Sequence, residues 1–252
     1  MTKDKVLLQL HAPQIGAGAS TLVRELHLQV REGQRWAVIG RNGAGKSTLL
    51  RVLAGLQPQP AAQVLLGGEP LAGLAPARLA RWRAYMPATP HDRFGIAVLD
   101  AVMLGQHEPD AALALEWLRR LDVVQLLRRS LLQLSAGERQ RVALAQSLAQ
   151  DTALLLLDEP ASFQDPRHQS ALAGLLRAHA DAAAPRALVF SAHDLNWVAA
   201  LSTHVLALLP DGSWRAGPAR DVLSHDTLQS AYGCAWQRIE RAGRSDLWVA
   251  LD

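Results

Sequence analysis

A glycine-rich stretch between a short apolar run and a helical pattern constrains this chain more than any other feature. Residues 40–48, GRNGAGKST, fit the pattern G-x-x-x-x-G-K-[ST] without a substitution. Residues 35–39 before it predict a buried strand, and residues 47–54 after it predict a helix that Gly55 ends. In this strand–loop–helix context, backbone N–H groups and the helix N-terminus bind phosphate. The alternative is a chance glycine-rich turn between a strand and a helix.

The loop carries the side chains that a nucleotide triphosphate requires. Lys46 is placed to reach the β- and γ-phosphates, and the Ser47 hydroxyl is placed to bind Mg²⁺. The cofactors expected from this pattern are therefore ATP and Mg²⁺. The loop residues expected to contact them are Gly40, Asn42, Gly43, Ala44, Gly45, Lys46, Ser47 and Thr48.

Two acids follow a second apolar run. Residues 153–157 are Ala-Leu-Leu-Leu-Leu, which is typical of a parallel strand covered on both faces, and Asp158 and Glu159 come next. Open α/β sheets bind ligands at the carboxyl ends of their strands. We expect Asp158 to complete the Mg²⁺ shell opposite Ser47 and Glu159 to polarise a water. Without the phosphate loop, these two acids could not be distinguished from the acidic loop residues that follow many strands.

Upstream of these acids, residues 134–141 read LSAGERQR. Ser135 and Glu138 form the pattern of a capping box, so a well-started helix is the simplest interpretation. The Ala136–Gly137 pair indicates more, because glycine is costly in a first turn unless something approaches the backbone closely. Exposed N–H groups at a helix start also bind phosphate.

The remaining chain alternates strands and helices, which predicts an α/β fold with a mainly parallel sheet and right-handed crossovers. An all-helical insert is expected from 98 to 132, because apolar residues there recur at helical spacing. A small-residue loop is expected at 15–20. The other expected strands are 6–10, 26–30, 63–66, 84–86, 187–191, 205–209, 214–215, 236–240 and 247–251, and the other helices are 76–83, 166–182, one from 194, and 227–232.

Composition narrows the setting. The 252 residues carry a net charge of +3 with no Lys/Arg run, which argues against a nucleic-acid partner. The single cysteine, Cys234, excludes an internal disulfide and fits a reducing compartment as a packing residue. No leader is expected at the N-terminus, and no window approaches the roughly 18 apolar residues of a membrane span. We expect a cytosolic protein that reaches a membrane only through a partner.

At these residues the sequence resembles the ATP-binding cassette family along essentially its whole length. Residues 40–48 are similar to the family's phosphate loop, and 134–138 to its signature motif, usually LSGGQ. Residues 154–159 resemble its Walker B strand with Glu159 as the catalytic acid. Asp165 matches the acidic position of the D-loop, and His193 matches the switch histidine. A lone histidine is more often an ordinary surface or core residue, but His193 follows a predicted buried strand at the family's spacing from Glu159, so we favour a catalytic role.

The resemblance implies a fold and a mechanism. The fold would be a P-loop NTPase core with an N-terminal antiparallel β subdomain and an all-helical insert. Two copies would close head to tail around two ATP molecules. The signature Ser135 and Gly137 of one copy would contact the γ-phosphate held by Lys46 of the other, and Ala136 and Glu138 would belong to the same cofactor-binding stretch. Closure would move membrane permease subunits, and hydrolysis would reset them.

Softer similarities favour one group within the family. Residues 98–105, 191–196 and 231–233 resemble importers of metal chelates: cobalamin, haem or iron-siderophores. Two departures matter. No aromatic residue near 15–17 is available to stack on adenine, and Ala88 stands where the family has a glutamine that contacts Mg²⁺ and the attacking water. Thr89 could replace it only with a one-residue shift.

The resulting hypothesis is a single domain, 1–252, divided into 1–87 (β subdomain and phosphate-loop part), 88–134 (helical insert) and 135–252 (the rest of the core and the tail). It would hydrolyse ATP to energise chelate import from the cytoplasmic side of the cell membrane. Its partners would be a second copy, permease subunits and, indirectly, a substrate-binding protein. The alternative is a nucleotide-switched binding module that hydrolyses ATP weakly because of Ala88.

Overall fold

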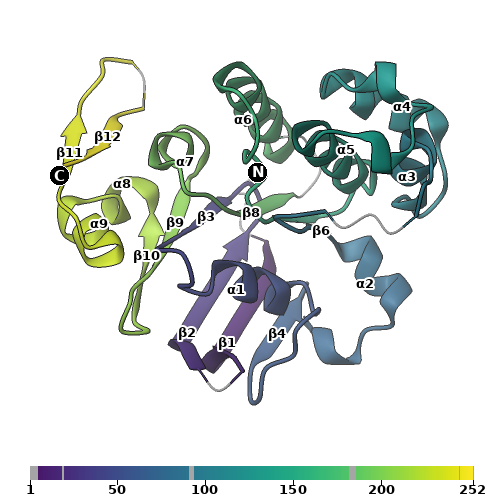
Figure 1. Ribbon diagram of the computed structural model, residues 1–252. Helices are drawn as coiled ribbons and strands as arrows, with labels where there is room; N and C mark the ends of the chain where they lie inside the picture. The colour runs from purple at the N-terminus through teal and green to yellow at the C-terminus, as the bar shows by residue number, and fades with distance from the viewer. Residues whose placement is uncertain (1–4, 19, 91–93, 182–185, 244, 252) are drawn as a thin grey trace.

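The computed structural model describes residues 5–18, 20–90, 94–181, 186–243 and 245–251. Its strands form a four-stranded sheet, a six-stranded sheet and a two-stranded ribbon (Figure 1). Helices cover the upper side of the six-stranded sheet, and α1 (Lys46–Leu53) lies between it and the four-stranded sheet. The predicted α/β fold with an N-terminal antiparallel sheet is therefore confirmed.

The four-stranded sheet has the order β2-β1-β4-β5 and is antiparallel throughout. Its strands are β1 (Val6–Ala17), β2 (Ser20–Arg31), β4 (Gln63–Leu66) and β5 (Glu69–Pro70). The loop predicted at 15–20 is wrong, because β1 continues to Ala17 and β2 begins at Ser20. The small residues there serve close pairing: a Cβ on Gly16 would lie 2.9 Å from the Ser20 carbonyl oxygen.

The six-stranded sheet has the order β10-β9-β3-β8-β7-β6, and its strands are parallel except for β10, which pairs antiparallel with β9. They are β3 (Arg35–Ile39), β6 (Arg83–Met86), β7 (Leu154–Leu157), β8 (Ala187–Ser191), β9 (His204–Leu208) and β10 (Trp214–Pro218). Every residue of β7 and β8 is buried, as expected for strands covered on both faces.

Two apolar cores lie on the two faces of this sheet. Alternate residues of β3 divide between them: Ala37 and Ile39 join the core with the upper helices, whereas Trp36 and Val38 join the core with α1 and the antiparallel sheet. Helices packed around these cores include α2 (Pro76–Trp82), α5 (Ala136–Ala149), α6 (Pro166–Ala180) and α7 (Leu195–Leu201). The predicted end of α6 at 182 lies outside the described residues.

The insert is helical where it is described. It contains α3 (Val98–Leu104), α4 (Ala111–Arg120) and the short 3₁₀ turns Val124–Leu126 and Leu131–Gln133. An isolated bridge between Ala97 and Ser130 joins its two ends. Both α3 and α4 pack on α5, so the insert is anchored on the helix that begins at the signature stretch.

The chain ends in α8 (Ala219–Val222), which the sequence did not predict, α9 (His225–Tyr232), β11 (Trp236–Ile239) and β12 (Leu247–Ala250). The last two strands pair as an antiparallel hairpin. Cys234 is a half-buried free thiol between α9 and β11. Among the described residues, no helix is both long enough and apolar enough to cross a lipid bilayer.

Candidate functional site

The predicted phosphate loop joins β3 to α1 and takes a path that glycine alone fits at two points. Gly40 has φ 145°, and a Cβ there would lie 2.8 Å from the Leu208 carbonyl oxygen. Gly45 is the N-cap of α1 and is left-handed, with φ 100°. The loop therefore turns tightly out of the sheet and delivers the helix N-terminus at the carboxyl end of β3.

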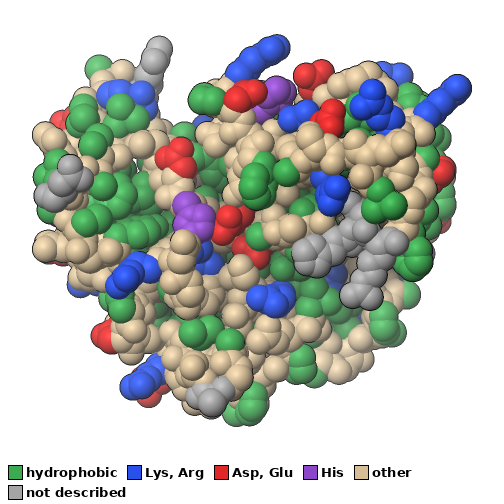
Figure 2. All heavy atoms as spheres, viewed as in Figure 1, with side chains coloured by type: hydrophobic (Ala, Val, Ile, Leu, Met, Phe, Trp, Pro, Cys, Tyr) green, Lys and Arg blue, Asp and Glu red, His purple; other side chains and the backbone are tan. Residues whose placement is uncertain are grey.

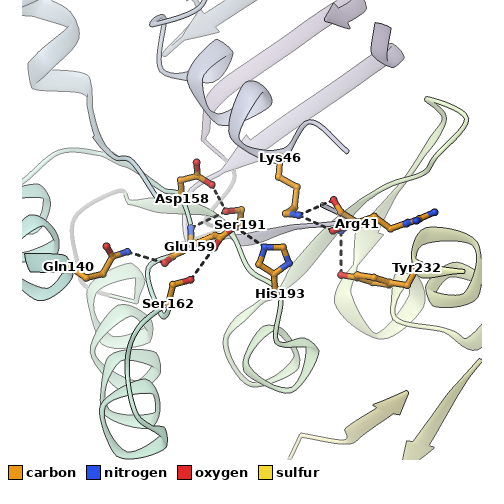
Figure 3. Close-up of polar contacts among 10 residues, drawn as sticks. Arg41, Lys46, Gln140, Asp158, Glu159, Ser162, Ser191, His193 and Tyr232 are labelled. Atoms are coloured by element: carbon orange, nitrogen blue, oxygen red, sulfur yellow. Dashed lines mark hydrogen bonds and ion pairs between the residues drawn. The ribbon is translucent and has the colours of Figure 1, made fainter. Parts of the chain in front are cut away.

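Lys46 lies across this loop. Its side chain is only 6% exposed, and its Nζ donates to the carbonyl oxygens of Gly40 at 2.8 Å and Arg41 at 3.1 Å (Figure 3). Burial lowers the pKa of Lys46, and the charges of Glu159 and Asp158 act in the opposite direction. Ser47 and Thr48 follow in the first turn of α1, half-buried and buried. One buried cation is thus placed beside the loop and within the field of two acids.

The two acids leave β7 next to β8, and Ser191 at the end of β8 joins them. Ser191 is fully buried; its Oγ donates to Asp158 Oδ1 at 2.6 Å and accepts from the Glu159 backbone N–H at 2.9 Å. Asp158 is 2% exposed, and its own N–H donates to the Met86 carbonyl at 2.9 Å on the other side. Ser191 thus fixes both acids relative to one another.

Glu159 has both carboxylate oxygens engaged. His193 Nε2 lies 2.7 Å from Oε1, and Ser162 Oγ donates to Oε2 at 3.0 Å. The backbone of Glu159 is left-handed, with φ 51°, and its carbonyl accepts from Gln140 Nε2 at 3.0 Å. Figure 3 shows that His193 and Ser162 approach Glu159 from different segments of the chain. The carboxylate is therefore held in one orientation.

The predicted capping box is present at the start of α5. Ser135 Oγ accepts from the Glu138 N–H at 3.3 Å, and Glu138 Oε2 accepts from the Ser135 N–H at 2.8 Å. The Ser135 hydroxyl also donates to Glu138 Oε2, at 2.8 Å, and the hydrogen bonds that this carboxylate accepts from the Ser135 backbone N–H and hydroxyl lower the pKa of Glu138. Ala136 is the first residue of the helix. A Cβ on Gly137 would lie 2.8 Å from the Phe163 carbonyl oxygen, so the close backbone approach expected at this glycine is made by this chain's own loop.

Asp165 caps the next helix. Its Oδ1 accepts from the His168 N–H at 2.9 Å and its Oδ2 lies 2.8 Å from His168 Nδ1, and hydrogen bonds from His168 lower the pKa of Asp165. Gln164 beside it donates to the Gly137 carbonyl and accepts from Arg141. The D-loop segment is therefore tied to the signature segment of the same chain.

The structure thus gathers Lys46, Asp158, Glu159 and His193 at the carboxyl ends of β3, β7 and β8, where Figure 3 shows their side chains converging. In Figure 2, acidic side chains and a histidine are grouped near the middle of the face shown. Ser135 and Glu138 bond to each other rather than to this group. Ala88 is half-buried in the bend after β6, two residues beyond Met86, and Thr89 is exposed.

Sequence reasoning missed three residues here. Ser191 is the polar end of an otherwise apolar buried strand, and this change at the strand end is the sequence signal that could have indicated it. Gln140 is the second, a polar side chain that is only 1% exposed in a helix. Tyr232 is the third: its hydroxyl accepts from the Gly40 N–H at 3.3 Å, across 192 residues of sequence. A hollow of about 210 Å³ flanks the loop and is lined in part by Leu22, Pro210 and Ala231.

Comparisons with known proteins agree with this geometry. The family model described as "ABC transporter" matches residues 16–162. The Hemin import ATP-binding protein HmuV of Bordetella pertussis is 39% identical over 242 residues, covering 90% of this chain and 92% of that protein. The Cobalamin import ATP-binding protein BtuD of Halobacterium salinarum is 37% identical over 220 residues, covering 84% of this chain and 55% of that protein.

Solved structures share the fold. "An inward-facing conformation of a putative metal-chelate type ABC transporter" contains a chain that matches with a TM-score of 0.82 and 24% identity, covering 98% of both chains. A "Structure of ATP binding subunit of ABC transporter" matches with a TM-score of 0.76 and 23% identity, covering 86% of this chain and 91% of the other. The family match, the close relatives and the site together place this chain in the ABC transporter family, as a subunit that hydrolyses ATP for transport.

Proposed function

We propose that this chain energises the import of a metal chelate, with haem, cobalamin and iron-siderophores as the candidate cargoes. The names of the relatives at 37–39% identity support haem and cobalamin. The observation that carries the hydrolytic part of the proposal is the setting of Glu159, which His193 and Ser162 orient at the strand end beside the phosphate loop. A carboxylate held in this way is suited to act as a general base on a water.

The residues at the strand ends would have different roles in ATP binding and hydrolysis. Lys46 would exchange its bonds to the loop carbonyls for bonds to the β- and γ-phosphates, which are stronger because both partners are charged. The remaining loop residues would offer N–H groups to the phosphates. His193 would keep Glu159 pointed at the attacking water, and Ser191 would keep Asp158 and Glu159 in register.

The donors present fit a magnesium ion. Mg²⁺ prefers hard oxygen ligands and keeps several waters. Ser47 supplies a hydroxyl in the first turn of α1, and Asp158 supplies a carboxylate whose Oδ1 is occupied by Ser191, so Oδ2 is the oxygen available for a cation. Bound Mg²⁺ would neutralise charge that develops on the phosphates. Ser47 and Asp158 would fix its position relative to Lys46.

A second copy of the chain would complete each site. Ser135, Ala136, Gly137 and Glu138 lie at the N-terminus of the 14-residue helix α5, where free N–H groups and the helix dipole favour an anion. We propose that they meet the γ-phosphate bound by the other copy and that Asp165 lies at the same junction. The bond from Gln140 to Glu159 would link the signature helix of one site to the base of the other.

The remaining expectations follow from this assignment. The chain would act as one domain, 1–252, because β6 from the 1–87 part pairs with β7 from the 135–252 part. It would sit at the cytoplasmic side of the cell membrane by binding permease subunits. A substrate-binding protein would deliver the chelate to those subunits. The alternative, which Ala88 favours, is that the chain hydrolyses ATP slowly and that nucleotide binding acts mainly as a switch.

The test is reconstitution with the permease subunits that bind this chain, in liposomes that also receive the binding protein. ATP hydrolysis would be measured with that protein loaded with haem, cobalamin or a ferric siderophore. Stimulation by one chelate, with uptake of that chelate, is the expected result. Hydrolysis that no chelate stimulates, in a complex that assembles and binds ATP, would contradict the proposed cargo class.

A further inference from the structure

The C-terminal segment, defined here as the described residues 225–243 and 245–250, contacts the phosphate loop and the start of α7, which both lie far from it in sequence. It comprises α9, β11 and β12 and lies to one side of the six-stranded sheet (Figure 1). Two short stretches noted in the sequence, 191–196 and 231–233, take no part in the mechanism above apart from Ser191 and His193. In the structure, this segment contacts 191–196 through Asn196, and 231–233 supplies its contact to the phosphate loop through Tyr232.

The first contact is made by Tyr232 to the phosphate loop. Its Oη accepts from the Gly40 N–H at 3.3 Å, while the Gly40 carbonyl accepts from Lys46 Nζ at 2.8 Å (Figure 3). Both polar groups of the first loop residue are therefore engaged, one by the C-terminal segment and one by Lys46. Burial raises the pKa of Tyr232 to about 12, which keeps the hydroxyl neutral at ordinary pH.

The second contact is made by Trp248 to α7. The Trp248 backbone N–H donates to Asn196 Oδ1 at 2.7 Å, and Asn196 Nδ2 donates to the Trp248 backbone carbonyl at 3.3 Å. Trp248 is 4% exposed and belongs to the main core. Asn196 is the second residue of α7, three positions after His193, and its own N–H is capped by Asp194. The hairpin is thus pinned to the helix that follows the histidine.

The two contacts are joined within the segment. The rings of Tyr232 and Trp236 lie 5.5 Å apart, and Trp236 opens β11. Strand β11 pairs with β12, with Arg238 opposite Trp248 in the register. A continuous set of packed and hydrogen-bonded groups therefore runs from Gly40 through the C-terminal segment to the start of α7.

The geometry points to Tyr232 and Asn196 as positioning residues, through which the C-terminal segment holds the phosphate loop and the His193 region in a fixed relation. This inference rests on the proposed function, because it takes Lys46 as the nucleotide contact and His193 as the partner of the base. Tyr232 sets the path of the loop where it leaves β3, so it governs nucleotide affinity. Asn196 sets the start of α7, so it governs the orientation of His193 and hence the rate of hydrolysis.

The two residues are therefore expected to give different kinetic signatures. Tyr232→Phe keeps the ring and removes the hydroxyl, and should raise the Kd for ATP about threefold to tenfold, the range for one net hydrogen bond. Asn196→Ala should lower kcat with a smaller change in KM. If the two residues had only a structural role, both substitutions would lower stability, and the effect on the Kd for ATP would not be separated from the effect on kcat. Matched controls remove a hydroxyl that bonds only its own helix: Ser230→Ala on α9 and Ser202→Ala at the end of α7.

Fluorine NMR tests whether nucleotide binding at the phosphate loop is felt in the C-terminal segment. The protein would be labelled with 5-fluorotryptophan, and the fluorine resonance of Trp236 would be assigned by its loss in Trp236→Phe. Addition of ATP and Mg²⁺ should shift this resonance in the parent and in Ser230→Ala, and should shift it less in Tyr232→Phe. Fluorescent ATP titrations on the same samples give the affinities, and thermal melts show that each variant is folded.

The outcomes separate the two claims. A parent that does not bind ATP, or a Lys46→Ala variant that binds like the parent, contradicts the proposed function. A parent that binds ATP with no change at Trp236 overturns the inference alone. So does a folded Tyr232→Phe variant with the Kd and the resonance shift of the parent. A lower kcat in Asn196→Ala matched by Ser202→Ala also counts against it.

Discussion

Nε2 of His193 lies 2.7 Å from Oε1 of Glu159, and the two side chains reach this distance from the ends of neighbouring parallel strands. The Glu159 carboxylate is also bonded by Ser162, so its orientation is set from two sides. The pair therefore presents a carboxylate of fixed orientation within the field of Lys46.

Replacing Lys46 by alanine should abolish most ATP binding. The substitution removes the buried cation that lies across the loop, and with it a charge-assisted contact worth about 1.5–3 kcal/mol, or roughly 10- to 100-fold in affinity. A fluorescent ATP titration with Mg²⁺ measures the effect. Lys5→Ala is the control, because Lys5 is exposed immediately before β1. Equal affinity in Lys46→Ala and the parent would remove the basis for the nucleotide site.

Replacing Glu159 by glutamine should preserve ATP binding and slow hydrolysis by about 10²–10⁴, the usual contribution of a positioned base. The amide retains the size of the carboxylate but does not take a proton. The variant should therefore accumulate as an ATP-bound dimer that elutes earlier in size-exclusion chromatography. Glu116→Gln, in an exposed ion pair on α4, should behave as the parent does. Normal hydrolysis by a monomeric Glu159→Gln protein would contradict both the role of Glu159 as the base and the ATP-bound dimer.

Replacing Ser191 by alanine should destabilise the protein by about 1–3 kcal/mol, the cost of leaving buried polar groups unsatisfied. The change removes the hydroxyl that bonds both Asp158 Oδ1 and the Glu159 N–H. Urea denaturation of the parent and the variant gives the difference. Ser213 makes the same kind of bond to Asp211 in an exposed turn, so Ser213→Ala is the matched control and should change stability little. Similar losses in the two variants would argue against a special role for the buried serine.

Stability should fall in mild acid partly because of His179. Burial, followed by the charge of Arg186, lowers the pKa of His179 from 6.5 to about 4. The unfolded chain therefore binds more protons than the folded chain between these values. The contribution is fully present above pH 6.5 and is lost as the pH falls through 4, by about 3 kcal/mol. Comparing urea curves of the parent and His179→Gln from pH 7 to 4 isolates it. Parallel pH profiles would show that His179 titrates normally.

Much of the site could be predicted because its signals are local. The phosphate loop, the acids after β7 and the capping box at Ser135 each occupy fewer than ten consecutive residues, and the strand–loop–helix order places the first two at one edge of a parallel sheet. The sequence could not predict bonds made across the fold. Ser191 meets Asp158 only because β8 pairs with β7, and Tyr232 meets Gly40 across 192 residues.

The wrong prediction at 15–20 has a similar cause. Small residues usually indicate a turn, but here Gly16 lets β1 and β2 approach closely. The pairing of these two strands therefore continues into a stretch that looked like a loop. Helix α8 was missed because its four residues are too few to show a helical period. The contacts of Asn196 with Trp248 also lie beyond any local pattern.

Replacing Ala88 by glutamine should raise ATP hydrolysis that the permease stimulates, while ATP affinity changes little. Ala88 follows β6 by two residues, and the Met86 carbonyl accepts from the Asp158 N–H at 2.9 Å, so this bend starts beside the proposed Mg²⁺ ligand. Alanine offers no polar atom to the metal's water shell. Because Mg²⁺ commonly keeps several waters, nucleotide binding does not depend on this position.

What a side-chain amide would add at position 88 is orientation of the attacking water and a polar link to the permease. An increase of about tenfold is expected, within the roughly 10² that misplacement of a reacting group can cost. Thr89→Gln places the same amide one residue further along, where the side chain is exposed, and should leave turnover unchanged. Parent and variants would be compared in liposomes with the same permease. If Ala88→Gln turned over no faster than the parent, or if Thr89→Gln gave the increase instead, Ala88 would be an ordinary loop residue and the contact would come from Thr89 or from the permease.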